Sequence, residues 1–230
     1  MGVCSRREAD RLIEAGKVLV DNRPASMGQK VTPGQKVVCN GKMVRVDRSQ
    51  RPRPVLLAVN KPKGIVCTTT DKDRAENIVD FLGYPERIYP VGRLDKDSEG
   101  LLLMTNQGDL VNKIMRSGNA HEKEYIVTVD CPLTDDAMDR MAKGIYLKEL
   151  DTVTRPCKVK RVDGKTCSII LTQGLNRQIR RMCEACGCHV KRLVRVRIMN
   201  IRLDGLFIQI DAGYARIVHL FEKLLQVGTA

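Results

Sequence analysis

The residues with the clearest potential for chemistry form an acidic turn, D-K-D-S-E-G, over residues 95–100. The segment 88–94 alternates loosely between apolar and polar residues, and the apolar run over 101–104 has the length of a buried strand. The pattern predicts two short strands on either side of a tight turn. A carboxylate held between two core strands is placed more rigidly than one on a free loop, which suits a catalytic group. Asp95, at the start of the turn, is the candidate.

Two other interpretations of this turn compete with catalysis. Asp95, Asp97, Glu99 and Gly100 occupy the first, third, fifth and sixth positions of an EF-hand-like calcium loop. The twelfth position should be a bidentate glutamate but is Asn106, and the flanking segments have the pattern of strands, so calcium is disfavoured. A solvated turn whose charges do nothing is the ordinary interpretation, and the rest of the chain has to decide against it.

A second group of reactive side chains lies on a predicted helix that we expect Asn176 to cap and Gly187 to end. Its buried stripe consists of Ile179, Met182, Cys183 and Cys186. Another face carries Arg177, Arg180 and Arg181. Three arginines at a helix start, where the dipole is already positive, favour an anion opposite them. The face is either a solvated basic surface, or a phosphate site with one arginine committed to a buried carboxylate.

Cysteine and histidine spacing suggests a metal site only superficially. Cys183, Cys186, Cys188 and His189 resemble a zinc knot, but two of them already belong to the buried stripe. No second pair stands at zinc-finger spacing, so we expect no metal. The nine cysteines are an odd number in a chain without an export signal, and we expect reduced thiols in the cytoplasm.

Charge is the most informative feature of the composition. The 40 Lys and Arg residues against 27 Asp and Glu give a net charge of +13, which indicates a polyanionic partner such as nucleic acid. Aromatic residues make up only 3% and Trp is absent, so phosphate contacts and shape are favoured over base stacking. There is no apolar run of about 18 residues and no signal peptide, so we expect a cytoplasmic protein with no membrane contact.

Residues 1–47 predict a small basic α+β module. Ser5 caps a helix that extends to Ala15, and Glu8 completes the capping box. Short strands follow over 17–20, 35–39 and 42–46. Asn40-Gly41 predicts a type I′ hairpin turn between the last two. The arginines that lie off the apolar stripe of the helix, and are candidates for RNA binding, are Arg6, Arg7 and Arg11.

This order of elements resembles the S4 domain, a small RNA-binding fold. The matching residues are C-S-R-R-E-A-D over 4–10, I-E-A-G-K-V over 13–18, Val20-Asp21, Val31 and Pro33-Gly34. The S4 fold normally has another helix before this point, so we expect the module to lack its first helix. On the residues alone, a minor α+β cap and an RNA-binding module are both open.

A linker over 48–54, rich in arginine and proline, separates this module from a second domain over 55–230. Predicted strands there cover 55–59, 124–129, 153–162, 166–172 and most of 190–203, with Asp163-Gly164 closing a hairpin. Predicted helices cover 77–82, 109–115, a segment from Thr134 or Asp135 to 143, and the tail from 216. Strands dominate and regular βαβ spacing is absent, so the class is α+β with a large mixed or mostly antiparallel sheet.

Four motifs in this order resemble the RsuA/RluB/RluE/RluF-type pseudouridine synthases. They are N-K-P-K-G over 60–64, G-R-L-D-K-D-S-E-G-L-L over 92–102, K-E-Y-I-V over 123–127 and G-L-N-R-Q-I-R-R-M over 174–182. The resemblance covers essentially the whole chain. The stretches D-L-V-N-K-I over 109–114, H-E-K-E-Y over 121–125 and R-I-M-N over 197–200 are similar to the RluF branch of that family.

The resemblance implies that a uridine of ribosomal RNA, from the large subunit, is isomerised to pseudouridine. The C1′–N1 bond breaks, the uracil turns, and C5 rejoins the same sugar, so no cofactor is implied. Such a reaction needs a carboxylate near the sugar, a pocket that excludes water and a uridine taken out of its stack. A transfer RNA as second substrate is left open, and a monomer is the default expectation.

The resemblance also implies roles for individual residues. Asp95 matches the catalytic aspartate, by covalent attack or as a base on the sugar, and Arg180 matches the arginine that pairs with it. Tyr125 matches the tyrosine that packs on the target base, or else it is a strand residue facing the core. The remaining supporting residues are Ile179 as an apolar wall, with Asn60 and Lys61 shaping the pocket. The arginines expected to contact RNA in this domain are Arg93, Arg177 and Arg181.

Two other classes of protein compete with an active enzyme. One is a catalytically silent RNA-binding factor for ribosome assembly on the same fold. A degenerate synthase has no reason to retain Asp95, Tyr125 and Arg180 together, which disfavours it. The other is a transcription factor that binds duplex DNA through the first module, but no recognition-helix pattern supports it.

Overall fold

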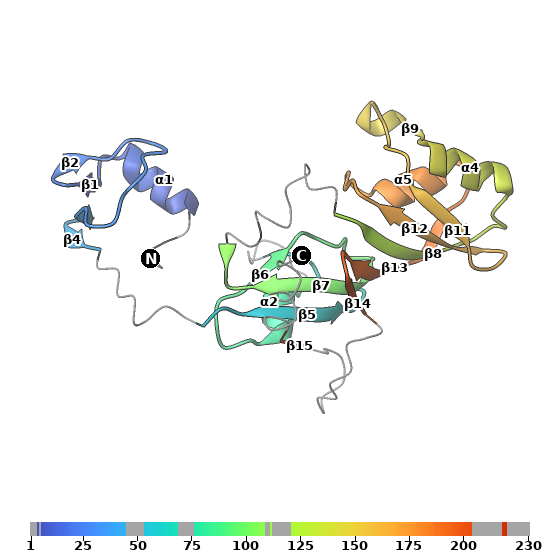
Figure 1. Cartoon of the computed structure of the whole chain (residues 1–230), viewed down its shortest axis with the longest axis horizontal. Coiled ribbons are helices and arrows are strands. Elements are labelled where there is room, and N and C mark those ends of the chain that lie inside the picture. The colour runs from blue at the N-terminus through green and yellow to red at the C-terminus, as the bar shows by residue number, and fades with distance from the viewer. Residues whose placement is uncertain are drawn as a thin grey trace, which may run out of the picture. The chain divides into compact units, whose positions relative to one another are not determined.

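The computed structural model of the 230-residue chain describes residues 4, 6–44, 53–68, 76–108, 111, 121–203 and 218–219 (Figure 1). Contacts within the chain divide it into two compact units, Met1–Arg53 and Pro54–Ala230. Within the described ranges, no helix combines the length and the apolar character that a membrane crossing requires.

The first unit has one helix, α1 (Arg6–Glu14), and a four-stranded sheet in the order β2-β1-β3-β4. Its antiparallel strands are β1 (Val18–Val20), β2 (Arg23–Pro24), β3 (Val37–Cys39) and β4 (Lys42–Met43). Asn40 and Gly41 have φ of 49° and 74°, which confirms the predicted type I′ turn. The predicted cap Ser5 lies outside the described residues.

The second unit is built on a large mixed sheet in the order β11-β12-β8-β13-β7-β5-β15 (Figure 1). Two further strands pair with its central strands, β6 with β7 and β14 with β13. Its strands are β5 (Leu56–Lys61), β6 (Tyr89–Val91), β7 (Glu99–Thr105), β8 (Lys123–Val129), β11 (Lys158–Arg161), β12 (Thr166–Leu171), β13 (Val190–Ile198), β14 (Ile201–Arg202) and β15 (Val218–His219). All neighbours are antiparallel except β7 and β13, which are parallel and share two register pairs, Val194 with Glu99 and Arg195 with Gly100. The α+β class with a mixed sheet is confirmed.

Short helices cover this sheet, and local capping explains where two of them begin. The helices are α2 (Ile78–Leu82), α4 (Asp135–Lys143), the 3-10 turn η3 (Lys148–Leu150) and α5 (Gln178–Ala185). The side chain of Asn77 accepts bonds from the first turn of α2, and Thr134 does the same for α4. A two-stranded hairpin, β9 (Tyr146–Leu147) with β10 (Thr152–Val153), completes the unit.

Several predicted boundaries are wrong, each for a physical reason. Helix α5 is preceded by Arg177 in a left-handed conformation (φ 48°), and Asn176 uses its side chain on Arg181 instead of capping the helix. The segment 190–203 turns at Met199 (φ 52°) to form β13 and β14, so it is a hairpin. Val218 and His219 pair with β5, so the sheet edge overrides the predicted terminal helix at these residues. In the predicted hairpin over 153–172 only 158–161 pairs with β12, while Val153 belongs to β10.

The predicted helix over 109–115 lies almost entirely outside the described residues. The hydrophobic core of the second unit forms three clusters, one between the β8–β12 side of the sheet and helices α4 and α5, and two around β5 and β7. Tyr125 packs against clusters from both sides. This residue therefore lies where the two halves of the core meet, which is also where the cavity described below opens.

Candidate active site

Asp95 lies in a cavity of about 480 Å³, within the usual range for a site that encloses a small molecule. The lining comes from four segments that are far apart in the sequence, within 91–98, 121–125, 171–179 and 193–198, with Val66 and Cys67 beside them. Of the predicted site residues, the cavity brings together Arg93, Asp95, Tyr125, Arg177 and Ile179. Among the described lining residues Asp95 is the only acid.

The turn that carries Asp95 is shaped by backbone bonds and by glycine. The carbonyl of Asp95 accepts a bond from the amide of Ser98 at 3.0 Å, which closes the turn. Gly100 has φ of 103°, and a Cβ there would lie 2.3 Å from the carbonyl oxygen of Arg195. Only glycine allows β7 to begin this close to β13. The two strands therefore approach most closely at the base of the turn.

Two buried cations hold this turn by its carbonyls. Lys61 is fully buried, and its Nζ donates to the carbonyls of Pro62 and Ser98, both at 2.8 Å. Arg180 is 8% exposed, and its Nη2 donates to the carbonyl of Asp97 at 3.0 Å and to Oγ of Ser98 at 3.4 Å. Charged donors to carbonyls are strong hydrogen bonds, so these contacts make the turn rigid.

The expected ion pair between Arg180 and Asp95 is not formed in this structure. The guanidinium of Arg180 bonds the backbone that follows Asp95, and its Nη1 reaches the carbonyl of Val190 at 3.4 Å. Neither Arg180 nor Lys61 lines the cavity among the described residues, and Asn60 is exposed on β5, opposite Leu101. Lys61 and Arg180 therefore support the site through the carbonyls of the turn, and Asn60 is not part of the cavity wall.

Charge around the turn is set by burial and by near neighbours. Burial lowers the pKa of Lys61, while Cys67 and the carboxylates of Asp95, Glu99 and Asp97 raise it. Burial raises the pKa of the Cys67 thiol, whose sulfur accepts a bond from the amide of Leu94. Burial therefore disfavours the thiolate form of Cys67, which is part of the cavity wall.

The arginines predicted to bind RNA have different surroundings. Arg93 and Arg177 are exposed at the cavity, and Arg177 lies 4.0 Å from the carboxylate of Asp97. Arg181 is held by an ion pair with Glu149 and by bonds to Asn176. In the first unit, Arg7 and Arg11 are exposed on α1, and the side chain of Arg6 lies outside what the structure describes.

Lys123 and Arg195 are among the basic residues of the cavity that were not singled out from the sequence, as is Lys96. Lys123 lies two residues before Tyr125 on β8, so strand alternation around Tyr125 could have indicated it. Arg195 lies directly across from Tyr125 on β13. It is 3% exposed, its Nε donates to the carbonyl of Leu101 at 2.7 Å, and its Nη1 donates to that of Arg93 at 3.4 Å.

A register shift in β13 determines which way Arg195 points. The shift lies between Arg195 and Arg197, which pair with the adjacent residues Tyr125 and Glu124. The two arginines therefore face opposite sides of the sheet although they are two residues apart. Simple alternation along β13 would place them on the same side, so the sequence gives no indication of this arrangement.

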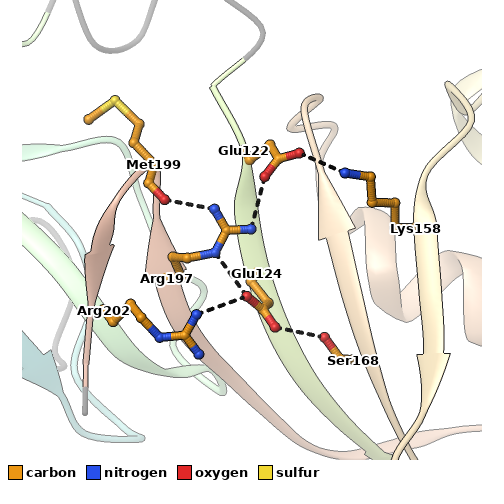
Figure 2. A network of polar contacts seen from close by, with 7 residues as sticks. All are labelled: Glu122, Glu124, Lys158, Ser168, Arg197, Met199 and Arg202. Carbon is orange, nitrogen blue, oxygen red and sulfur yellow. Dashed lines mark hydrogen bonds and ion pairs between the residues drawn. The ribbon is translucent and has the colours of Figure 1, made fainter. Parts of the chain in front are cut away.

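On the opposite face, Arg197 is the centre of a polar network (Figure 2). The network connects five strands, β8, β11, β12, β13 and β14. Its guanidinium lies 2.9 Å from Glu124 and 2.9 Å from Glu122, and it donates to the carbonyl of Met199 at 2.7 Å. The outer members are Lys158, 3.3 Å from Glu122, Ser168, 3.0 Å from Glu124, and Arg202, 3.9 Å from Glu124. The bond from Arg197 holds the pKa of Glu124 below its usual value. The network fixes the register that places Tyr125 and Arg195 at the cavity.

The cysteines differ from the prediction at one pair. Cys131 and Cys188 form a disulfide, so the expectation of reduced thiols is wrong for these two. They meet because β8 ends at Val129 directly opposite Val190, where β13 begins. Among the described residues, Asp130 lies beside the disulfide and can share a metal only with Cys131 and Cys188, whereas Cys183, Cys186 and His189 are not part of that group. The zinc-knot candidates are thus not gathered into one cluster within the described residues.

Comparison with known proteins gives consistent matches over most of the chain. The sequence model of the family described as RNA pseudouridylate synthase matches residues 55–185, and that of the S4 domain matches residues 1–37. The dual-specificity RNA pseudouridine synthase RluF of Escherichia coli O6:H1 is 54% identical over 205 residues, which are 89% of this chain and 69% of that protein.

More distant relatives agree with this result. Ribosomal large subunit pseudouridine synthase B of Bacillus subtilis is 37% identical over 211 residues, 89% of this chain and 84% of that protein. A crystal structure of a pseudouridylate synthase, 25% identical, superposes with a TM-score of 0.67 and covers 95% of this chain and 92% of that one.

Proposed function

The chain belongs to the RNA pseudouridylate synthase family, and from that premise we propose that it isomerises one uridine of large-subunit ribosomal RNA to pseudouridine, with Asp95 as the catalytic group. The observation that carries the proposal is the position of Asp95. It is the single acid among the described lining residues of a cavity that also contains Tyr125 and Ile179. Two relatives named as RluF and as a ribosomal large subunit synthase support the substrate.

The proposed reaction rearranges bonds within a single nucleotide. The C1′–N1 bond breaks, the uracil turns over, and C5 bonds to C1′, after which C5 loses its proton and N1 gains one. The atoms of substrate and product are the same, so no oxidant and no cofactor is needed. Asp95 acts on the sugar, and a rigid turn holds it in place because Lys61 and Arg180 bind the carbonyls behind it.

The walls of the cavity suit a base taken out of its stack. Tyr125 offers an aromatic face and Ile179, 4% exposed, an apolar contact. Exposed Arg93 and Arg177 beside the cavity suit phosphate contacts, as do Arg7 and Arg11 on α1 of the first unit. Arg181 and Arg6 complete the set of arginines that we propose for RNA binding.

Further expectations follow for the whole protein. The name of one relative as a dual-specificity enzyme supports a second RNA substrate, and transfer RNA is the candidate. We expect a monomer that works in the cytoplasm, where ribosomal RNA is made and modified.

The test is to map pseudouridine in ribosomal RNA from cells with and without this protein, with a chemical probe that stops reverse transcription. One site in large-subunit RNA should disappear on deletion. It should return with the wild-type protein but not with Asp95→Ala or Asp95→Asn. If the site returned fully with Asp95→Ala, the proposed role of Asp95 would be refuted. If no site changed in ribosomal or transfer RNA, the silent RNA-binding factor would be the better interpretation.

A further inference from the structure

We propose that Lys123 and Arg195 form a cationic pair on the cavity wall that accepts the negative charge of the uracil ring when it leaves C1′. The inference rests on the proposed reaction and extends it by two side chains from neighbouring strands, β8 and β13. The pair flanks Tyr125, which is the residue proposed to pack on the same ring.

Lys123 is a half-buried cation with no counterion among the described residues. It lines the cavity on the same face of β8 as Tyr125, and its ammonium makes no hydrogen bond or ion pair with any residue that the structure describes. Burial lowers its pKa, and the neighbouring guanidinium of Arg195 lowers it further. Lys123 and Arg195 repel each other in a partly desolvated site, and an anion that binds there would offset this repulsion.

One hydrogen-bond donor of the Arg195 guanidinium is unused within the described residues. Its Nε and Nη1 donate to the carbonyls of Leu101 and Arg93, but its Nη2 is buried and has no partner in the described part of the chain. Unsatisfied buried donors on charged groups are destabilising, and folded proteins keep few of them. Within the described ranges no carboxylate lies within 4.0 Å of Arg195 or Lys123. The structure therefore holds a buried positive charge at the cavity without its own counter-charge.

The depth of the two side chains favours the base over a phosphate as the anion. A phosphodiester is broad and hydrated, and Arg93, Lys96 and Arg177 already offer it exposed cations around the cavity. Arg195 is only 3% exposed, so the group that reaches its surroundings must be small and flat. A uracil taken out of its stack has that shape, and its carbonyl oxygens carry the charge that develops.

The charge arises at a defined step. When the C1′–N1 bond breaks, its electron pair stays on the ring and is shared by N1, O2 and O4. The ring loses this negative charge when C5 forms its bond to C1′. C5 then gives up its proton and N1 takes one up, which gives the neutral product. Fixed cations beside the ring stabilise this intermediate more than the neutral uridine, so they accelerate the reaction instead of tightening binding.

The test compares Lys123→Met with wild type on RNA that carries tritium at C5 of uridine, since tritium is released when C5 joins the sugar. At saturating protein in a single turnover, Lys123→Met should release tritium about 100-fold more slowly, while its Kd for the RNA stays within about twofold of wild type. Lys123→Arg should recover most of the rate. Lys160→Met, on an exposed lysine of β11, is the matched control and should behave as wild type.

A second substrate separates charge acceptance from a structural effect. With 5-fluorouridine at the target, the fluorine itself stabilises the anionic ring, so the defect of Lys123→Met should shrink several-fold. The readout is the loss of intact 5-fluorouridine from nucleoside digests. Arg195→Lys, which keeps the charge but not the geometry, should show a defect that shrinks in the same way.

Three results would overturn the inference. The first is a wild-type rate for Lys123→Met. The second is a defect of Lys123→Met that lies wholly in the Kd for RNA, as loss of a phosphate contact would give. The third is a rate defect that is equal for uridine and 5-fluorouridine, as a purely structural role would give. Failure of the proposed function itself is distinguishable, because then the wild-type protein would release no tritium.

Discussion

Replacing Gly100 with alanine should damage both the stability and the activity of the second unit. A Cβ at this position would lie 2.3 Å from the carbonyl oxygen of Arg195 and 2.7 Å from its amide nitrogen. To restore a separation of at least 3.0 Å, the backbones of β7 and β13 must move apart by about 0.7 Å. The positive φ of 103° adds strain for any side chain.

The size of the effect follows from these two terms. Left-handed strain contributes about 1–3 kcal/mol and the forced separation about 1–3 kcal/mol more, which together are a large part of a typical stability of about 5–15 kcal/mol. Gly64 is the matched control, because its φ is 97° and a Cβ there would meet nothing within 4 Å. Gly64→Ala should therefore lose only the strain term.

Urea unfolding followed by circular dichroism measures both variants, and tritium release measures activity. We expect Gly100→Ala to be less stable than Gly64→Ala by at least about 1 kcal/mol. Its activity at saturating protein should fall about 100-fold, because a displacement near 1 Å at the catalytic turn is enough for that loss. Equal stability of the two alanine variants would refute the argument that the close approach of the backbones requires glycine.

Three further predictions concern the support of the site. Arg197→Met should lower the free energy of unfolding by about 1–3 kcal/mol, because it leaves Glu124 without its main partner; urea unfolding of Arg197→Met against Lys160→Met measures this. Bonds from Arg192 and Arg197 hold the pKa values of Glu99 and Glu124 below 4.5. The stability that these carboxylates contribute should therefore be present above about pH 4.5 and be lost as the pH falls through their folded-state pKa. A midpoint of urea unfolding that stays constant from about pH 6 to about pH 3 would contradict this. The Cys131–Cys188 disulfide joins two residues that are 57 positions apart in the sequence. Its reduction should lower the free energy of unfolding by up to about 4 kcal/mol, and Cys131→Ser should show the same loss without reductant.

Local patterns were enough to predict the elements that carry Asp95, Tyr125 and Ile179. The apolar run after the acidic turn is a buried strand, and the arginine-rich segment is a helix whose Ile179 faces the core. These elements are specified by residues within a few positions of each other, and periodicity records such information directly. The same holds for the cap at Thr134 and for the turn at Asn40-Gly41.

What depended on distant residues could not be predicted. The orientation of Arg195 depends on a register shift relative to β8, and the strand at Val218 depends on a free edge of β5. The resemblance implied that Arg180 pairs with Asp95, whereas in this structure its side chain donates to the carbonyl of Asp97 and to Oγ of Ser98. Local patterns contain no information about which oxygen a long side chain will reach.

The parallel pairing of β7 with β13 has a mechanical consequence. Only two register pairs join these strands, whereas β5 and β7 share six and β8 and β13 share seven. The sheet therefore consists of two well-paired halves, one that contains β5 and β7 and one that contains β8 and β13, and few pairs join them. We expect the sheet to bend where β7 meets β13. Asp95 lies in the turn before β7, on one half of the sheet, whereas Tyr125 on β8 and Ile179 on α5 belong to the other half. We expect a nucleotide that contacts both halves to restrict this bending, and so to set the distance between the carboxylate of Asp95 and the ring of Tyr125.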